Sequence, residues 1–288
     1  SRLITFDERG NPVNDIVKSW GVSQDGTVYN FELREDVKWH DGQPLTNEDV
    51  VFTLDMLKNG GDAIPADLQT FWQDIEVVAL GTTALQFRLP EPFAPFLDYL
   101  TFGILPKHLL DGMSFEEMKE AQFNLQPVGS GPYQLDRLIV ENGIIQGVSL
   151  KAFADYYGSK TFIPTLVFRY YPDSASAFQA YQEGTVEGVS EITLDVLPDA
   201  LAEPNLGLYT GRKPELSMVL FNLKDQQATF LADAEIRRAL YLGINRQAIV
   251  DRLLQGQGIL ADGPIFPGTW AYYDGLPRIA YEPDTAIT

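Results

Sequence analysis

The sequence has 288 residues and carries 21 Lys and Arg residues against 40 Asp and Glu residues, so its formal net charge is −19 with both histidines neutral. This charge excludes most nucleic-acid binders, which need clustered cations to hold phosphates, and it disfavours binding to anionic membrane surfaces. Hydrophobic residues make up 45% of the chain, which predicts a folded protein, and the length suggests about two domains.

The sequence contains no cysteine, which rules out disulfides, thiolate metal sites and cysteine nucleophiles. Gly, Pro or a charged residue interrupts every hydrophobic stretch before it reaches the roughly 18 apolar residues that a membrane-spanning helix needs. No signal peptide is visible, but the strand-like residues 2–6 follow Ser1 at once, so we expect the natural start to lie upstream.

The first part of the chain predicts a β-meander followed by a helix. Residues 27–34 alternate between apolar and polar side chains, which is typical of a half-buried strand, and Asp-Gly turn signals at 25–26 and 41–42 bracket it. Thr46 then predicts the N-cap of a short amphipathic helix. A second hairpin is predicted over residues 75–89.

Further along, strands and helices alternate, which indicates a mixed α/β body rather than a pure sandwich or a bundle. The predicted strands span residues 133–138, 144–153, 166–171 and 217–223, and the predicted helices span 174–182, 194–202 and a pair that begins at Asp233 and Asn245 and ends at Gly256. The tail from residue 258 to 288 shows no sustained period, so we expect an extended covering segment.

Motifs for catalysis are scarce. The dinucleotide-like pattern Gly256-x-Gly258-x-x-Ala261 follows a helix instead of a strand, and the glycine-rich residues 129–132 lack the Lys-Ser/Thr of a phosphate loop. A metal site or a serine triad would depend on His40 and His108, the only two histidines, and no Gly-x-Ser-x-Gly occurs. We therefore expect no cofactor, no metal site and no nucleophilic catalysis.

Adjacent acidic residues occur at 35–36, 48–49 and 116–117. Solvation and the favourable field at a helix N-terminus explain such pairs better than catalysis does. A glycosidase needs two carboxylates facing each other across a sugar bond, which a sequence cannot show. A secreted carbohydrate-active hydrolase using paired carboxylates is therefore the alternative function, and an interaction module without a small ligand is a third.

Large aromatic residues gather in segments predicted to be loops, where a cleft could use them to stack on a ligand. Core packing accounts for about half of such residues, and Trp72 and Trp270 are the better pocket candidates because each lies in a turn-rich segment. The candidate ligand-binding residues are Phe71, Trp72, Tyr133, Tyr181, Asn222, Trp270 and Tyr272.

A series of motifs runs through nearly the whole chain. In chain order they are Asp25-Gly26-Thr27-x-Tyr29-x-Phe31-x-Leu33-Arg34, His40-Asp41-Gly42-Gln43-Pro44, Pro127-Val128-Gly129-Ser130-Gly131-Pro132-Tyr133, Glu183-Gly184-x-Val186-Glu187, Phe221-Asn222 and Ile236-Arg237-Arg238-Ala239-Leu240 with Ile244-Asn245-Arg246. This series resembles the family 5 extracellular solute-binding proteins, which are the peptide, oligopeptide and nickel receptors of bacterial ABC importers. Glu187 and Asn245 stand where that family usually has Asp.

The resemblance implies an α/β fold like that of type II periplasmic binding proteins, with two lobes and an extra subdomain. Chains of that family continue well beyond the point matched by Thr288, which implies a truncated chain with an incomplete second lobe. The implied domains are an extra subdomain of the first lobe at residues 1–106, the first-lobe α/β core at 107–215 and the start of the second lobe at 216–288.

The resemblance also implies a function without covalent chemistry. It indicates the extracytoplasmic substrate-binding component of an ABC importer, which captures peptides or a similar small solute between two lobes and delivers it to a membrane permease. We expect a monomer in the periplasm or outside the cell, with a lipid anchor as an option. The family's best-known ligand contacts lie largely beyond the matched part, so they cannot be assigned to residues of this chain.

Overall fold

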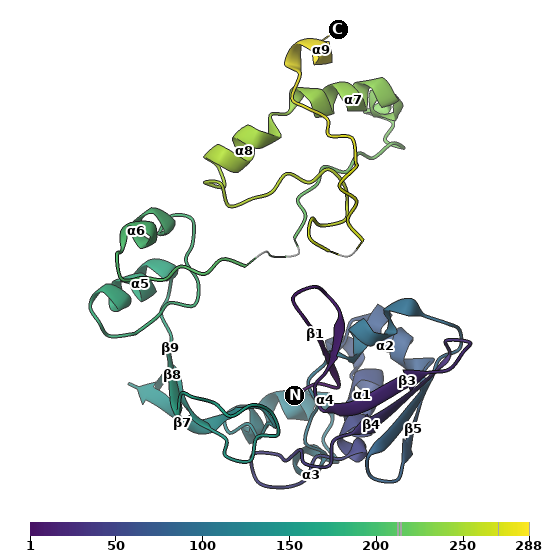
Figure 1. The fold of residues 1–288 in the computed structure, drawn as a ribbon, viewed down its shortest axis with the longest axis vertical. Helices are drawn as coiled ribbons and strands as arrows, with labels where there is room; N and C mark the ends of the chain where they lie inside the picture. Colours follow the sequence, from purple (N-terminus) through teal and green to yellow (C-terminus); the bar gives the residue numbers. More distant parts are fainter. Residues whose placement is uncertain (212, 214, 270, 288) are drawn as a thin grey trace. The chain divides into compact units, whose positions relative to one another are not determined.

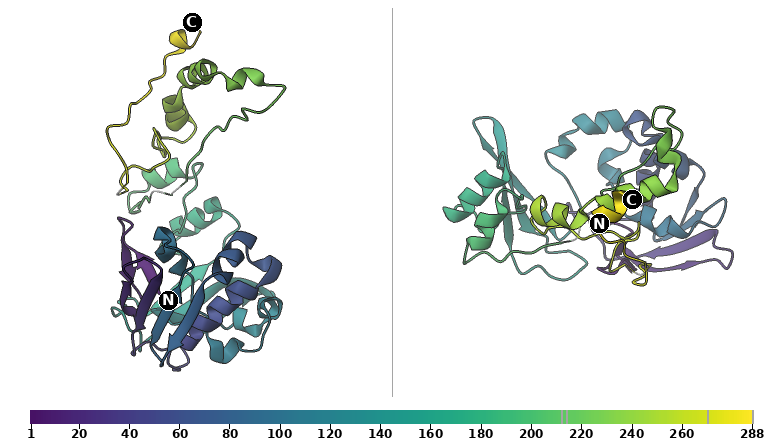
Figure 2. Two further views of the ribbon diagram at one scale, coloured as in Figure 1. Left: turned by 90° about the vertical axis from the view of Figure 1, so that its right-hand side faces the viewer. Right: turned by 90° about the horizontal axis from the view of Figure 1, so that it is seen from above.

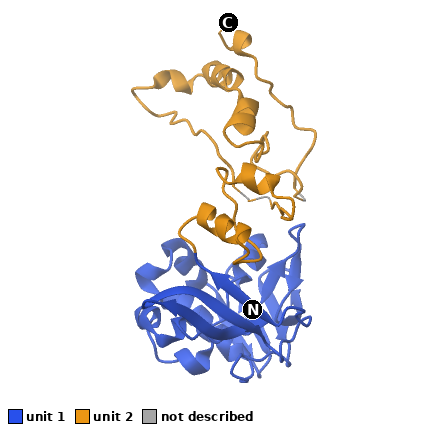
Figure 3. Ribbon diagram, turned by 90° about the vertical axis from the view of Figure 1, so that its left-hand side faces the viewer, with its two compact units in different colours: residues 1–170 blue, residues 171–288 orange. Residues whose placement is uncertain are grey.

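The computed structural model describes residues 1–288 except 212, 214, 270 and 288. It divides the chain into two compact units, unit 1 at Ser1–Tyr170 and unit 2 at Tyr171–Thr288 (Figure 3). This single division coincides with neither of the boundaries expected at 106 and 215, and the three-part division stays a prediction. No helix among the described residues is long and apolar enough to cross a membrane.

Unit 1 contains a four-stranded antiparallel sheet with the order β3-β4-β6-β5 (Figure 1). Its strands are β3 (Val17–Val22), β4 (Val28–Leu33), β5 (Glu76–Leu80) and β6 (Ala84–Arg88). The alternation predicted over 27–34 is confirmed, because Tyr29, Phe31 and Leu33 of β4 all point into the core. The hairpin predicted over 75–89 is also confirmed as β5 and β6.

Helices cover one side of this sheet in both Figure 1 and Figure 2. The elements around it are the hairpin β1 (Ile4–Phe6) and β2 (Pro12–Asn14), helices α1 (Asn47–Asn59) and α2 (Ala66–Gln73), and the 3-10 helices η1 (Gly61–Ala63) and η2 (Ala94–Leu100). Val50 and Leu54 of α1 and Phe96 of η2 join the inward side chains of the sheet in one apolar core. Burial of this core is the main force that stabilises unit 1.

The remainder of unit 1 is a three-stranded antiparallel meander preceded by short helices. These elements are α3 (Lys107–Leu110), α4 (Phe115–Glu120), η3 (Gln122–Asn124), β7 (Tyr133–Glu141), β8 (Ile144–Ala152) and β9 (Thr165–Arg169). Asn142 and Gly143 form the β7–β8 turn with φ of 53° and 78°. Two successive left-handed residues are what a tight hairpin turn requires, and Asn-Gly supplies them at low cost.

Unit 2 consists mainly of short helices and extended segments. They are α5 (Ser174–Gln182), α6 (Leu197–Ala202), η4 (Thr229–Ala232), α7 (Ala234–Gly243), α8 (Arg246–Arg252) and α9 (Pro283–Ile287). The predicted helices at 174–182 and 194–202 and the pair starting at Asp233 and Asn245 are confirmed. The tail predicted to be extended ends in α9, which packs on α7.

The strand predicted over 217–223 is not formed, because the described residues in this segment have no strand partner. A strand is defined by backbone hydrogen bonds to a neighbour, and sequence propensity alone does not supply one.

Candidate functional site

Two of the sequence motifs meet at His40. The His40 amide donates to the Gly129 carbonyl at 2.8 Å, and the Gly129 amide donates to Nδ1 of the ring at 3.1 Å. Nε2 of the ring lies 3.0 Å from the Gly131 carbonyl, an arrangement that fits a neutral imidazole with its proton on Nε2. The ring also packs edge-on against Phe153, with the centroids 4.9 Å apart.

Burial of His40 lowers its pKa, the largest cause being desolvation of the charged form. Geometry agrees with this direction, since a protonated Nδ1 could not accept from the Gly129 amide. A Cβ placed on Gly129 would lie 3.2 Å from Cε1 of the ring, so a side chain at this position would press on the imidazole. His40 therefore joins the turn before α1 to the loop that leads into β7.

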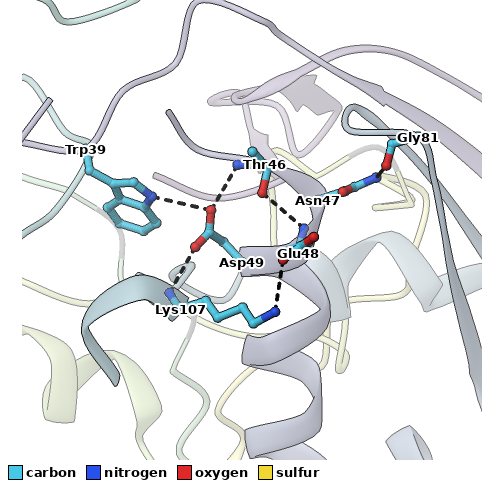
Figure 4. Close-up of polar contacts among 7 residues, drawn as sticks. All are labelled: Trp39, Thr46, Asn47, Glu48, Asp49, Gly81 and Lys107. Carbon is cyan, nitrogen blue, oxygen red and sulfur yellow. Dashed lines mark hydrogen bonds and ion pairs between the residues drawn. The ribbon is translucent and has the colours of Figure 1, made fainter. Parts of the chain in front are cut away.

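Asp49 forms a second junction, shown in Figure 4. One of its carboxylate oxygens accepts from the Lys107 amide at 2.9 Å, and the other accepts from the Thr46 amide at 2.9 Å and from the Trp39 indole at 3.4 Å. The Thr46 side chain caps α1 in return, so that the pair forms a capping box. Asp49 is only 5% exposed, and a buried carboxylate is stable only when it is hydrogen-bonded in this way.

The neighbouring side chains on α1 complete the same junction (Figure 4). Asn47 donates to the carbonyls of Gly81 and Ala84 at 3.2 and 2.8 Å, which fixes the start of α1 to the β5–β6 turn. Glu48 forms an exposed ion pair with Lys107 at 2.9 Å. The acidic pair 48–49 is thus explained by one helix cap and one surface contact.

A third junction ties the loop after β8 to the start of the chain and to β4. The Tyr157 hydroxyl donates to Asp15, and the Arg34 guanidinium lies 5.2 Å above the Tyr157 ring. Burial, followed by the hydrogen bond to Asp15, raises the pKa of Tyr157 above its usual range. Lys38 and Asp155 add an ion pair of 2.8 Å. This junction and the His40 contacts together tie the part of unit 1 around the four-stranded sheet to the β7–β9 meander.

His108 of α3 pairs with an acidic side chain of the turn that contains His40. Its Nε2 lies 2.6 Å from the Asp41 carboxylate, and its ring lies beside Trp39 with the centroids 6.2 Å apart. The described residues contain no group of three or more His, Asp or Glu side chains placed to hold a metal ion. We therefore interpret this pair as a surface link between α3 and the turn that contains His40.

The structure corrects the expectation that Trp72 lines a cleft. Trp72 is 0% exposed, and its ring packs edge-on against Phe102 and Phe96 in the core of unit 1. Because its helix turns this side chain inward, no face of the ring is open to a solute. Phe71, the preceding residue, is half-buried and stacks on the partly exposed Tyr99 at 4.1 Å between centroids.

Two further candidates are half-buried and already engaged. The Tyr133 hydroxyl donates to the Ile163 carbonyl at 2.9 Å, which ties β7 to the segment before β9. Tyr181 stacks on Phe178 at 6.2 Å between centroids, at the border of a small core that α5 and α6 share. Their rings can offer an edge or one face to a ligand, and ligand contact by either residue stays a prediction.

The remaining candidates belong to unit 2. Asn222 is exposed, and its side-chain oxygen accepts from the Lys224 amide at 3.1 Å in a local turn. Tyr272 is half-buried and lines a cavity of about 590 Å³. Trp270 lies outside the described residues. Ligand contact by Asn222 and Tyr272 likewise stays a prediction.

The cavity beside Tyr272 contains a charged cluster that sequence reasoning missed. The Asp262 side chain is 10% exposed and lies 3.7 Å from Arg246 and 3.5 Å from Arg278. Arg246 also donates to the Ala261 carbonyl at 2.8 Å. The members come from three separate segments, so no local spacing could have indicated the cluster.

Comparisons with known proteins find one family similar to nearly the whole chain. Residues 11–288 match the family described as bacterial extracellular solute-binding proteins, family 5 Middle. The dipeptide-binding protein of Escherichia coli (strain K12) is 29% identical over 299 residues, which cover 94% of this chain and 53% of that protein.

Solved structures of binding proteins are also similar to nearly the whole chain. NikZ from Campylobacter jejuni in complex with Ni(L-His) has a TM-score of 0.76 and 29% identity, and the match covers 99% of this chain and 55% of NikZ. AppA from Bacillus subtilis in complex with a nonapeptide has a TM-score of 0.71 and 26% identity, and the match covers 99% of this chain and 56% of AppA. The chain therefore spans about half the length of the proteins it matches.

Proposed function

Because the chain belongs to the bacterial extracellular solute-binding proteins of family 5, we propose that its protein captures a peptide or a similar small solute and delivers it to the membrane permease of an ABC importer. The observation that carries this proposal is the family match over residues 11–288. A peptide is the favoured solute, because the similar proteins include a dipeptide-binding protein and AppA with a bound nonapeptide.

Capture of this kind is an equilibrium between an open and a closed form. A solute that touches both lobes at once stabilises the closed form by its extra contacts there, and it shifts the population by that difference in affinity. A micromolar affinity, which corresponds to about −8 kcal/mol, is sufficient. For a peptide, hydrogen bonds to its extended backbone supply much of this energy, while roomy pockets accept varied side chains.

The contacts from this chain are proposed at the aromatic and amide side chains that keep an accessible surface. They are Phe71, Tyr133, Tyr181, Asn222 and Tyr272. The half of the relatives' length that this chain does not cover supplies the remaining contacts. We accordingly expect the 288-residue chain to bind the solute weakly or not at all.

No covalent step is part of the proposal. The rival function, a carbohydrate-active hydrolase, requires two free carboxylates facing one pocket. In the acidic pair on α1, the buried Asp49 carboxylate accepts three hydrogen bonds from neighbouring residues of unit 1. Glu48 forms a surface ion pair. The relatives described above are named for binding and not for hydrolysis.

Location and assembly follow from the same role. The family is described as extracellular. We propose a monomer that works in the periplasm or at the cell surface, with a lipid anchor as one way to retain it near the permease.

Isothermal titration calorimetry tests the division of the binding site. A peptide mixture, and then single peptides, are titrated into the 288-residue chain and into the complete natural polypeptide. We expect micromolar or tighter binding by the complete polypeptide and at least a 100-fold loss in the shorter chain. Equal affinity in both would show that this chain holds the whole site, and binding by neither would contradict peptide capture.

A further inference from the structure

The two histidines of the sequence contact the same turn, residues 39–43. His40 belongs to the turn and binds the loop 129–131, which leads into β7. His108 lies on α3 and binds Asp41 of the turn. The turn is therefore held on two sides, and an imidazole makes the contact on each side.

The two imidazole contacts respond differently to a proton. Nδ1 of His40 accepts from the Gly129 amide while Nε2 donates to the Gly131 carbonyl, so this ring must be neutral. A proton on Nδ1 replaces the acceptor by a second donor that faces the Gly129 amide. His108 uses only Nε2, which donates to the Asp41 carboxylate at 2.6 Å in both the neutral and the protonated ring. Protonation therefore breaks the first contact and leaves the second.

The surroundings of the His40 ring favour its neutral form. The loop 129–131 presents backbone amides and carbonyls to the ring, and Phe153 packs edge-on against it. Burial is the largest effect and lowers the pKa of His40 below its usual 6.5. The amino group of Ser1 acts in the same direction, and the neighbouring carboxylate of Asp41 opposes it.

The loop 129–131 contains a group that favours its opening. Ser130 is 1% exposed, and its hydroxyl has no hydrogen-bond partner among the described residues. A buried hydroxyl without a partner is unfavourable, and it gains hydrogen bonds to water when the loop opens. Gly129 and Gly131 flank Ser130 and let the backbone change conformation at low cost. Exposure of this hydroxyl therefore offsets part of the cost of opening.

Other contacts keep the β7–β9 meander attached when the loop opens. Lys38 and Asp155 form an ion pair of 2.8 Å, and the Tyr157 hydroxyl donates to Asp15. Neither contact involves an imidazole. Protonation of His40 is thus expected to free the loop locally, while the rest of unit 1 stays folded.

We propose that the turn 39–43 is a proton-sensitive clasp, which releases the loop 129–131 when His40 is protonated and stays bound to α3 through His108. The released loop leads into β7, whose first residue, Tyr133, is one of the proposed solute contacts. The proposed location outside the cytoplasm exposes the clasp to the pH of the surroundings. This inference goes beyond the proposed function and does not depend on which solute is bound.

Amide hydrogen exchange of the 288-residue chain, measured by NMR at about pH 7.5 and about pH 5.5, tests the clasp. The open form takes up one more proton than the closed form below the usual pKa of His40. We therefore expect the protection factor of the Gly129 amide to fall about 10-fold, after correction for intrinsic exchange rates. The Leu45 amide, which donates to the Val37 carbonyl at 3.0 Å beside the turn, should keep its protection. No fall at Gly129, or an equal fall at Leu45, would overturn the proposal.

Replacement of each histidine by Gln separates the clasp from general effects of acid. The carboxamide in His40→Gln accepts and donates hydrogen bonds but does not titrate, so protection of the Gly129 amide should change less than about 2-fold. His108→Gln is the matched control, which retains His40 and should show the same fall of about 10-fold as the wild type. A full fall in His40→Gln, or its absence in His108→Gln, would contradict the proposal.

Nitrogen NMR of the imidazoles provides a readout that needs no change at His40. In His108→Gln the one remaining imidazole belongs to His40, which assigns its signals. We expect a neutral ring with its proton on Nε2 at about pH 7.5. A proton on Nδ1 at this pH would overturn the proposal, because the contact with the Gly129 amide would then not exist.

Discussion

Replacement of His40 by Ala tests the junction between the turn before α1 and the loop that leads into β7. The change removes the hydrogen bonds to the Gly129 amide and the Gly131 carbonyl and the edge-on contact with Phe153. With about 0.5–1.5 kcal/mol for each hydrogen bond and a similar amount for the aromatic contact, the expected loss is about 2–4 kcal/mol of the free energy of unfolding. The backbone bond from His40 to Gly129 remains.

Urea denaturation followed by tryptophan fluorescence measures this loss, because Trp20, Trp39 and Trp72 all belong to unit 1. His108→Ala is the matched control, since it removes the other imidazole from a partly exposed pair with Asp41 and should cost less than about 1 kcal/mol. Equal losses for the two variants would show that the buried contacts of His40 add no more stability than the partly exposed pair of His108 with Asp41.

The same junction should be sensitive to acid. Burial lowers the pKa of His40 below its usual 6.5, so the unfolded chain takes up this proton first as the pH falls. The contribution of His40 is therefore complete above about pH 6.5 and is lost as the pH falls below it. The stability difference between the wild type and His40→Ala should shrink between pH 7 and pH 5. A difference that stays constant or grows would contradict a neutral His40.

Two further substitutions test other parts of unit 1. Asp49→Asn should lower the free energy of unfolding by about 1–3 kcal/mol because one of the two accepting oxygens is lost. Glu48→Gln on the same helix is the control and should cost less than about 1 kcal/mol, because it removes only an exposed ion pair. Urea denaturation that ranks the two variants in the reverse order would contradict the buried junction at Asp49. Gly147→Ala should cost about 1–3 kcal/mol, because the added Cβ would lie 2.3 Å from the Phe168 carbonyl oxygen of β9. Gly21→Ala is the control, because its added Cβ would meet open space and the change should be nearly neutral. We expect faster hydrogen exchange in β9 for Gly147→Ala only. Faster exchange for both variants, or for neither, would contradict the predicted clash.

The parts of the fold that could be predicted from the sequence are those whose signals are local. The alternation in β4, the Thr46 cap of α1 and the position of α5 each depend on residues close together in the chain, and all are confirmed. The fold class expected from the motif series, a type II periplasmic-binding-protein-like fold, is also confirmed by the similar structures, of which this chain spans about half the length.

Features that depend on distant partners were not predictable in the same way. The strand expected at 217–223 has the right propensity, but nothing in the described chain pairs with it. Trp72 lies in a turn-rich segment, yet the rotation of α2 turns its ring into the core. The cluster of Asp262 with Arg246 and Arg278 forms only when three segments fold together.

Mass spectrometry of the complete natural polypeptide decides whether the proposed capture leaves the peptide chemically unchanged. The protein is incubated with a defined peptide mixture, the bound species are observed in the native complex, and the peptides are then released and weighed. We expect complexes that carry peptide and the release of every peptide at its original mass. Shortened or modified peptides that accumulate with time would contradict it, as would the absence of any bound peptide.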